Sequence, residues 1–132
     1  MIIGVGIDIL SIDRIRKGSY SMTDAFMRKT YTEKERRQAM ERDDPTLYFA
    51  TRFAGKEAVF KSLRIDNSKG SFSEIEILND DDGRPSATLS GTLQKLAEGN
   101  GVGEVLISLS YETDYATAFA VAQSAQPNQK KE

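Results

Sequence analysis

Hydrophobic positions alternate with small or polar ones at the start of the chain, with the period of a β-strand. From Ile2 to Leu10 the aliphatic residues are separated by Gly4, Gly6 and Asp8. Because successive side chains of a strand point to opposite faces, this segment predicts a strand with one crowded face and one bare face. Asp8 lies on the bare face.

Helical signals dominate the rest of the first half. Residues 32–35 read Thr-Glu-Lys-Glu, the spacing of a capping box in which the threonine and the later glutamate satisfy free backbone donors. Pro45 is tolerated in the first turn of a helix, and apolar residues recur after it at helical spacing. The predicted helices are a short one that Ser11 caps and Gly18 ends, one over 23–29, one from Thr32 to about Glu41, and the longest from about Pro45 to Leu63.

The second half of the chain changes mostly to strand patterns. Asp82-Gly83 is a hairpin-turn signal between two apolar segments. The predicted elements are strands at 71–78, 86–89, 105–111 and 116–122 and a short helix at 92–98. Together with the early helices they indicate an α+β fold, a small antiparallel sheet packed with helices, whose faces would need contacts between subunits to be buried. We predict one domain over residues 1–123 and a flexible polar tail over 124–132.

The amino-acid composition limits the reactions and partners that are possible for the chain. A chain of 132 residues with 39% hydrophobic content suits a single core. Its 18 basic and 20 acidic residues nearly cancel, which gives no reason to expect nucleic acid or a membrane surface as a partner. Cysteine and histidine are absent, which excludes disulfides, thiolate nucleophiles, zinc clusters and imidazole bases. No basic run precedes the first apolar segment and no apolar run approaches the ~20 residues of a membrane span, so we expect a cytoplasmic protein.

Two carboxylates stand out against this background. Asp8 interrupts an apolar strand, where aspartate is rare unless it has a partner; alternatively, it ends the strand and caps the next turn. Glu57 shares one side of the long predicted helix with Phe53 and Phe60, so it is expected to face the core. A purely structural ion pair with Lys56 or Lys61 is the alternative for Glu57.

Two inward carboxylates without histidine or cysteine suit Mg²⁺, which keeps several waters and takes further ligands from a substrate phosphate. The same helix carries Arg52, Lys56 and Lys61, which can offer positive charge to a pyrophosphate. The alternative for these three cations is an ordinary solvated helix face.

At this point the sequence resembles a known family, the holo-acyl-carrier-protein synthases. The opening segment 4–9 is similar to the family's first-strand motif, and segment 52–61 is similar to its central helix motif. Three further segments, 31–35, 72–77 and 107–110, match in order and spacing. The resemblance extends from Met1 to about Val121, nearly the whole chain.

The resemblance implies a fold, an activity and roles for individual residues. It implies a homotrimeric phosphopantetheinyl transferase with active sites between subunits, which moves the 4′-phosphopantetheine arm of coenzyme A to a serine of acyl carrier protein and releases adenosine 3′,5′-bisphosphate. The implied residues are Asp8 and Glu57 as Mg²⁺ ligands, Glu57 and Lys61 as catalytic groups, Arg52, Lys56, Lys61, Ser108 and Tyr111 as contacts to coenzyme A, and Arg14, Phe26 and Arg28 as the docking surface for the acidic carrier. For Arg52 and Lys56 the alternative is a contact to a neighbouring subunit.

Two departures from the family pattern keep other functions open. Tyr111 stands where many members have histidine, and a phenol is a poor base at neutral pH, so Glu57 or a metal-bound water would have to accept the serine proton. The glycine-rich loop expected after the central helix is also altered, at 64–70. The alternatives are a catalytically weak or inactive relative that binds coenzyme A or a carrier protein, and a different metal-dependent phosphotransferase or nucleotide-binding protein.

Overall fold

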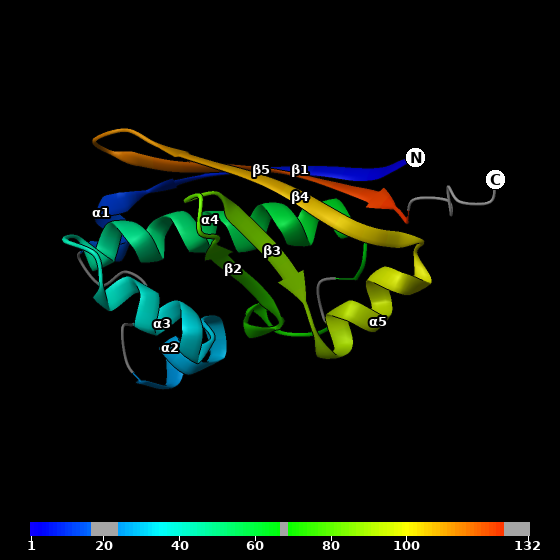
Figure 1. Ribbon diagram of the computed structural model, residues 1–132, viewed down its shortest axis with the longest axis horizontal. Coiled ribbons are helices and arrows are strands. Elements are labelled where there is room, and N and C mark those ends of the chain that lie inside the picture. The colour runs from blue at the N-terminus through cyan, green and yellow to red at the C-terminus, as the bar shows by residue number, and fades with distance from the viewer. Residues whose placement is uncertain (17–23, 67–68, 126–132) are drawn as a thin grey trace.

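A three-stranded sheet lies on one side of the long helix α4, and the remaining helices and a short hairpin cover much of its other side (Figure 1). The computed structural model describes residues 1–16, 24–66 and 69–125. The elements in chain order are β1 (Ile2–Ser11), α1 (Ile12–Arg16), α2 (Asp24–Thr30), α3 (Glu33–Met40), α4 (Pro45–Leu63), the 3₁₀ turn η1 (Phe72–Glu74), β2 (Ile75–Asn79), β3 (Pro85–Leu89), α5 (Gly91–Gly99), β4 (Val102–Tyr111) and β5 (Tyr115–Ser124).

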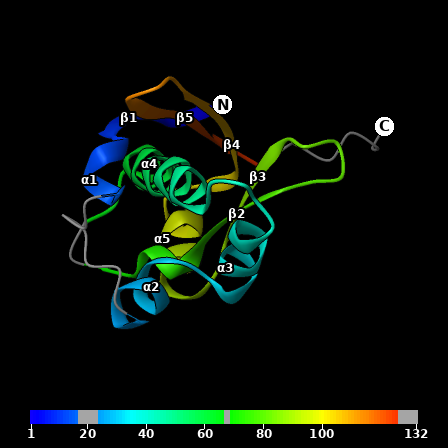
Figure 2. The same ribbon diagram turned by 90° about the vertical axis from the view of Figure 1, so that its left-hand side faces the viewer.

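The larger sheet has the antiparallel order β1-β5-β4, so the first strand of the fold pairs with the last. Its central strand, β5, presents alanines to α4, and every one of them is at most 2% exposed. Small side chains let a helix lie close to a sheet, and Figure 2 shows α4 end-on beneath the three strands. The alanines are Ala116, Ala118, Ala120 and Ala122.

In β1 the face with the glycines is buried and the aliphatic face is exposed, the reverse of the usual arrangement. The bare face packs against α4, because a Cβ atom added to Gly6 would overlap the carbonyl oxygen of Ala58. The crowded face points away from the helix, and Val5, Ile7 and Ile9 remain 56%, 64% and 67% exposed. Glycine at position 6 thus permits the close approach of strand and helix, while the aliphatic face lies uncovered in a single chain.

The predicted helices and the hairpin are largely confirmed. Thr32 and Glu35 form the capping box of α3, and Pro45 lies in the first turn of α4. Gly83 makes the hairpin turn with φ of 84°. The α+β class is confirmed, and its relatives in known structures are described below.

Two expectations about the strands are wrong. The strand predicted over 71–78 begins only at Ile75, because Ser71 caps a 3₁₀ turn and forms a capping box with Glu74. The hairpin β2–β3 is also a separate two-stranded sheet rather than part of one sheet. Local side-chain bonds to the backbone thus compete with strand pairing at 71–74.

Parts of four predicted segments lie outside the described residues. These parts are Gly18, the stop signal for the first helix, Thr23 at the start of the second, 67–68 in the altered loop 64–70, and most of the predicted tail, 126–132. β5 continues through Ser124, and the domain boundary at 123 stays a prediction. None of the helices in the described segments has the length and apolar composition needed to span a membrane.

Candidate active site

Strand β1 and helix α4 bring Asp8 and Lys61 together. Asp8 lies within β1, paired with Ala118 of β5, so the alternative in which it ends the strand is wrong. Lys61 Nζ donates to the carbonyl oxygen of Ile7 at 2.9 Å and lies 3.5 Å from Asp8 Oδ1. The Asp8 side chain is 19% exposed and the Lys61 side chain is 51% exposed, so the ammonium group borders solvent.

Glu57 completes this group, one turn of α4 before Lys61. Its side chain is half-buried at the edge of the core rather than inside it, and Lys56 is not its ion-pair partner. Burial raises the pKa of Glu57, the negative charge of Asp8 raises it further, and Lys61 opposes both effects. Burial likewise raises the pKa of Asp8 against the attraction of Lys61. The two carboxylates are therefore close enough to repel each other, and a cation between them would relieve that repulsion.

This donor set fits Mg²⁺. Among residues 1–16, 24–66 and 69–125, no three histidine, cysteine, aspartate or glutamate side chains gather into a metal-binding cluster. The protein can therefore supply Asp8 and Glu57, and waters and phosphate oxygens would fill the remaining positions. Mg²⁺ is commonly bound in this way in phosphoryl-transfer sites, through one or two carboxylates.

A cavity of about 370 Å³ opens beside Glu57 and Lys61. Its apolar surface comes from Phe60, Phe72 and Leu93, and Lys69 adds a second positive charge. A chain-like ligand with a phosphate at one end could thus meet both cations and apolar side chains in one cavity.

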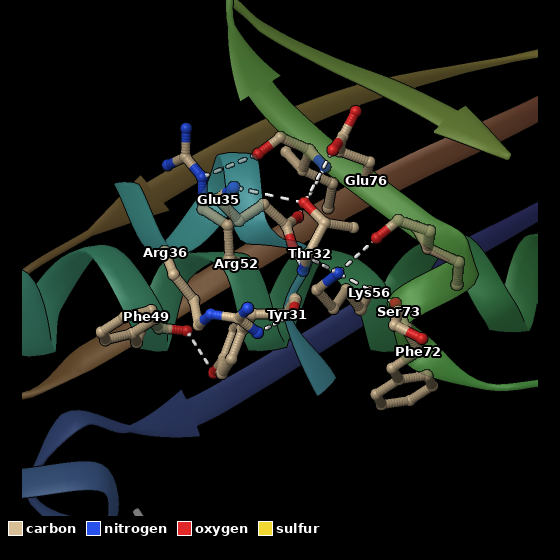
Figure 3. Close-up of polar contacts among 12 residues, drawn as sticks. Tyr31, Thr32, Glu35, Arg36, Phe49, Arg52, Lys56, Phe72, Ser73 and Glu76 are labelled. Atoms are coloured by element: carbon tan, nitrogen blue, oxygen red, sulfur yellow. Dashed lines mark hydrogen bonds and ion pairs between the residues drawn. The ribbon is translucent and has the colours of Figure 1, made fainter. Parts of the chain in front are cut away.

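Two of the predicted coenzyme contacts are buried. Lys56 is fully enclosed, and its Nζ lies 2.8 Å from Glu35 Oε1 (Figure 3). Arg52 is 5% exposed, and its guanidinium group donates to Asn79 Oδ1 at 2.7 Å and stacks over Tyr48. Lys56 cannot touch a ligand without unfolding this region, and both cations differ from the solvated face that the sequence allowed.

Of the remaining predicted coenzyme contacts, Lys61 lies 3.5 Å from Asp8, whereas Tyr111 and Ser108 lie apart from it. Tyr111 and Arg52 line a second cavity of about 390 Å³, together with Arg42 and Tyr48. Ser108 is exposed on the outer face of the sheet, opposite the face that carries Asp8. Within one chain these residues therefore do not form a single site.

The three predicted docking residues lie on the first two helices. Arg14 of α1 and Arg28 of α2 are exposed. Phe26 is half-buried and its ring lies edge-on to Tyr31, with 6.5 Å between centroids. Helix α2 is tied to the cavity beside Glu57, because Ser71 Oγ donates to the carbonyl oxygen of Lys29 at 3.0 Å.

Comparison with known proteins decides the family. Residues 4–120 match the model of the 4′-phosphopantetheinyl transferase superfamily. The chain belongs to this superfamily. Among relatives in the superfamily, the holo-[acyl-carrier-protein] synthase of Desulforudis audaxviator is 37% identical over 99% of this chain and 100% of its own length. That of Protochlamydia amoebophila is 39% identical over 94% and 100%.

Solved structures of superfamily members have the same fold as this chain. The holo-[acyl-carrier-protein] synthase of Neisseria meningitidis has a TM-score of 0.83 at 35% identity, covering 94% of this chain and 100% of that one. A holo-(acyl-carrier-protein) synthase from Bacillus anthracis in complex with CoA (3′,5′-ADP) has a TM-score of 0.74 at 36% identity, covering 95% and 99%. The family resemblance and the fold class inferred from the sequence are confirmed.

The carboxylate pair predicts a pH-dependent response to Mg²⁺. At a Mg²⁺ concentration a hundredfold above Kd, the free energy of unfolding should rise by about 2.7 kcal/mol. Because the pKa values of Asp8 and Glu57 are raised, this gain should fade on acidification at a higher pH than for ordinary carboxylates. Thermal unfolding with and without Mg²⁺ across pH measures it, and a gain independent of pH would contradict binding by these groups.

The metal-free protein should respond to pH in the opposite sense. A carboxylate whose folded pKa is raised stabilises the fold most below its unfolded pKa, and the contribution is lost as pH rises through the folded pKa. Metal-free Glu57→Gln should therefore gain stability relative to metal-free wild type as pH rises.

Proposed function

We propose that this chain is a Mg²⁺-dependent holo-[acyl-carrier-protein] synthase, which transfers 4′-phosphopantetheine from coenzyme A to a serine of acyl carrier protein. The observation that carries the proposal is that Asp8, Glu57 and Lys61 lie together, and that Glu57 and Lys61 line a cavity with apolar side chains. The activity is the one named in the relatives that match almost the whole chain.

In the proposed mechanism the residues of this chain position a diphosphate and neutralise its charge. Asp8 and Glu57 would hold Mg²⁺, which supplies Lewis acidity to the phosphate oxygens. The Lys61 ammonium group, fixed by the Ile7 carbonyl, would contact the phosphate that leaves with adenosine 3′,5′-bisphosphate. The carrier serine attacks the phosphorus that bears the pantetheine arm, the bond from that phosphorus to the bridging oxygen breaks, and a carboxylate oxygen of Glu57 takes the serine proton.

The proposed site includes a neighbouring subunit. The outer face of the three-stranded sheet is apolar and exposed, and exposed patches of this kind mark interfaces. We propose a homotrimer that buries this face and in which the cavity of Arg52 and Tyr111 from one copy completes the site of Asp8 and Glu57 in the next. The exposed apolar residues of this face are Val5, Ile7, Ile9, Leu106 and Phe119.

A negative charge introduced on this outer face should dissociate the proposed trimer. Phe119 is 45% exposed at the centre of the outer face, between Ile7 and Ser108 in the strand register. Phe119→Glu is expected to reduce the sedimenting mass to one third and to abolish transfer. A variant that stays trimeric, or a monomer that retains activity, would contradict an interface at this face.

The acidic carrier is proposed to dock on α1 and α2. Arg28→Glu should raise the carrier KM at low salt, by roughly tenfold if one rim charge contributes about 1.4 kcal/mol, and the effect should shrink as salt screens the charge. Lys95→Glu, an equal charge change on exposed α5, is the matched control. Steady-state kinetics at two ionic strengths measure the difference, and equal KM values for both variants would remove Arg28 from the docking surface.

An assay of transfer to an apo-carrier protein tests the proposed activity. Apo-carrier protein, coenzyme A and Mg²⁺ are mixed with the protein, and the carrier is weighed by mass spectrometry. We expect the mass of one phosphopantetheine to be added. An unmodified carrier at several pH values would favour the alternative, a relative that binds coenzyme A or carrier without turnover, for which the replacement of histidine by Tyr111 is the supporting observation.

A further inference from the structure

A buried ion pair lies directly behind the candidate active site. Lys56 precedes Glu57 on α4, and its side chain and that of Glu35 on α3 are both 0% exposed. Taking two charges out of water costs several kcal/mol per ion, which good geometry and further hydrogen bonds must offset. Neither group can reach a substrate, so any effect on the reaction must pass through the segments that the pair joins.

The hydrogen bonds of the pair join four segments (Figure 3). Lys56 Nζ donates to Glu35, to the carbonyl oxygen of Phe72 at 2.9 Å and to that of Ile75. The ammonium group thus has an acceptor for each of its three protons. Glu35 in turn accepts from the backbone N–H of Thr32 at 2.9 Å and of Ile77 at 2.7 Å. One ion pair therefore fixes the start of α3, the middle of α4, the turn η1 and strand β2.

The turn η1 forms a wall of the cavity beside Glu57. The Phe72 ring lines that cavity and packs against Phe53 and Phe60, with centroids 5.7 Å and 6.2 Å away. Lys56 thus connects the helix that carries Glu57 directly to the part of the cavity wall that η1 forms.

We propose that the Glu35–Lys56 ion pair positions the transfer reaction by fixing the Phe72 wall relative to Glu57, where the pantetheine arm of the coenzyme would lie. This inference rests on the proposed function. Lys56 and Glu35 are positioning residues, since they touch no reacting atom. Misplacement of a bound group by about 1 Å can cost on the order of a hundredfold in rate. A change at the pair should therefore lower kcat without removing the metal ligands.

Two variants and one control test the kinetics. Lys56→Met removes the ammonium group, and the double variant Glu35→Leu with Lys56→Met removes both charges while keeping apolar volume, so it should fold even where the single variant does not. Ser62→Ala is the control, because Ser62 is also buried on α4, and the bond that its hydroxyl makes among the described residues stays within the helix, to the carbonyl oxygen of Val59 at 2.7 Å.

The expected pattern separates positioning from loss of stability. Per folded molecule, kcat should fall roughly tenfold to a hundredfold in the Lys56 variants. The Mg²⁺ concentration for half-maximal activity should change less than about twofold, because Asp8, Glu57 and Lys61 are untouched. Ser62→Ala should keep kcat within about twofold of wild type even where its melting temperature falls.

A second readout does not depend on activity. The chain has no tryptophan, so Phe72→Trp introduces a single fluorescent reporter into the wall. Adding Lys56→Met to Phe72→Trp should shift the emission to longer wavelength and increase quenching by acrylamide, whereas adding Ser62→Ala should do neither. Wild-type kcat together with unchanged emission in a folded Lys56 variant would overturn the inference. A wild type that transfers nothing would instead refute the proposed function, while the reporter still measures whether the pair holds the wall.

Discussion

Replacing Glu57 with glutamine is expected to lower phosphopantetheine transfer by at least about a hundredfold while the protein remains folded. The amide has nearly the same shape as the carboxylate but is a much weaker ligand for Mg²⁺ and no base. Losing several kcal/mol of stabilisation by the metal accounts for this loss, at 1.4 kcal/mol per factor of ten. Kinetics with saturating substrates and circular dichroism together measure rate and fold.

The same variant separates a catalytic carboxylate from a structural one. Burial, and then the charge of Asp8, raise the pKa of Glu57, so removing the Glu57 charge removes a desolvation cost and a repulsion, and the metal-free variant should melt no lower than metal-free wild type. The rise in melting temperature with Mg²⁺ should largely disappear. Glu98→Gln on exposed α5 is the control and should keep both activity and the Mg²⁺ response. Activity of Glu57→Gln within a few fold of wild type would end its assignment as a ligand.

Gly6→Ala is expected to destabilise the fold by about 1–3 kcal/mol, the usual range for overpacking. The added methyl group would overlap the Ala58 carbonyl oxygen and lie 3.0 Å from Lys61 Cβ, so β1 and α4 must move apart. That movement carries Asp8 away from Glu57, so the Mg²⁺ requirement should also rise. Chemical denaturation and a Mg²⁺ titration of activity measure the two effects.

Gly99→Ala is the control that shows whether the effect of Gly6→Ala depends on the contact between Gly6 and α4. Gly99, at the end of α5, has open space where a Cβ would be added, and alanine is the better helix former. Gly99→Ala should therefore leave stability and the Mg²⁺ requirement unchanged or slightly improved. Equal effects at the two positions would show that the contact between Gly6 and α4 does not hold the site together.

Local signals in the sequence were sufficient for most elements. The capping box at 32–35 and the proline at 45 each fix a helix start through bonds that involve only near neighbours. The same signal was present at Ser71-Phe72-Ser73-Glu74, where it makes a 3₁₀ turn instead of the predicted strand. Ser-x-x-Glu before an apolar run thus indicates where the chain turns but not how far a helix continues.

The candidate site was only partly predictable. The hydrophobic pattern placed Asp8 on one face of a strand and Glu57 on the inner side of a helix, whereas the expectation that they meet with Lys61 came from the family resemblance. The burial of Lys56 did not follow, since α4 is enclosed on nearly all sides and a helical projection then shows no solvent face. What decides the position of Lys56 is Glu35, which lies on another helix and appeared in the sequence only as part of a capping box.

The hydrophobic pattern also could not show which face of β1 packs against α4. Alternation shows that two faces differ but not which one meets the helix, and here the close packing of Gly6 reverses the usual assignment.

The pairing of β1 with β5 has a consequence for biosynthesis. Among the described elements β1 is synthesised before all others, whereas β5, the only described strand with which it pairs, is synthesised after all of them. Until β5 has been synthesised, β1 has no partner strand and its aliphatic side chains stay exposed in an unpaired segment, and such segments are prone to aggregate. Pairing of β1 should therefore be a late and slow step of folding, because it requires closing a loop that contains all the other described elements.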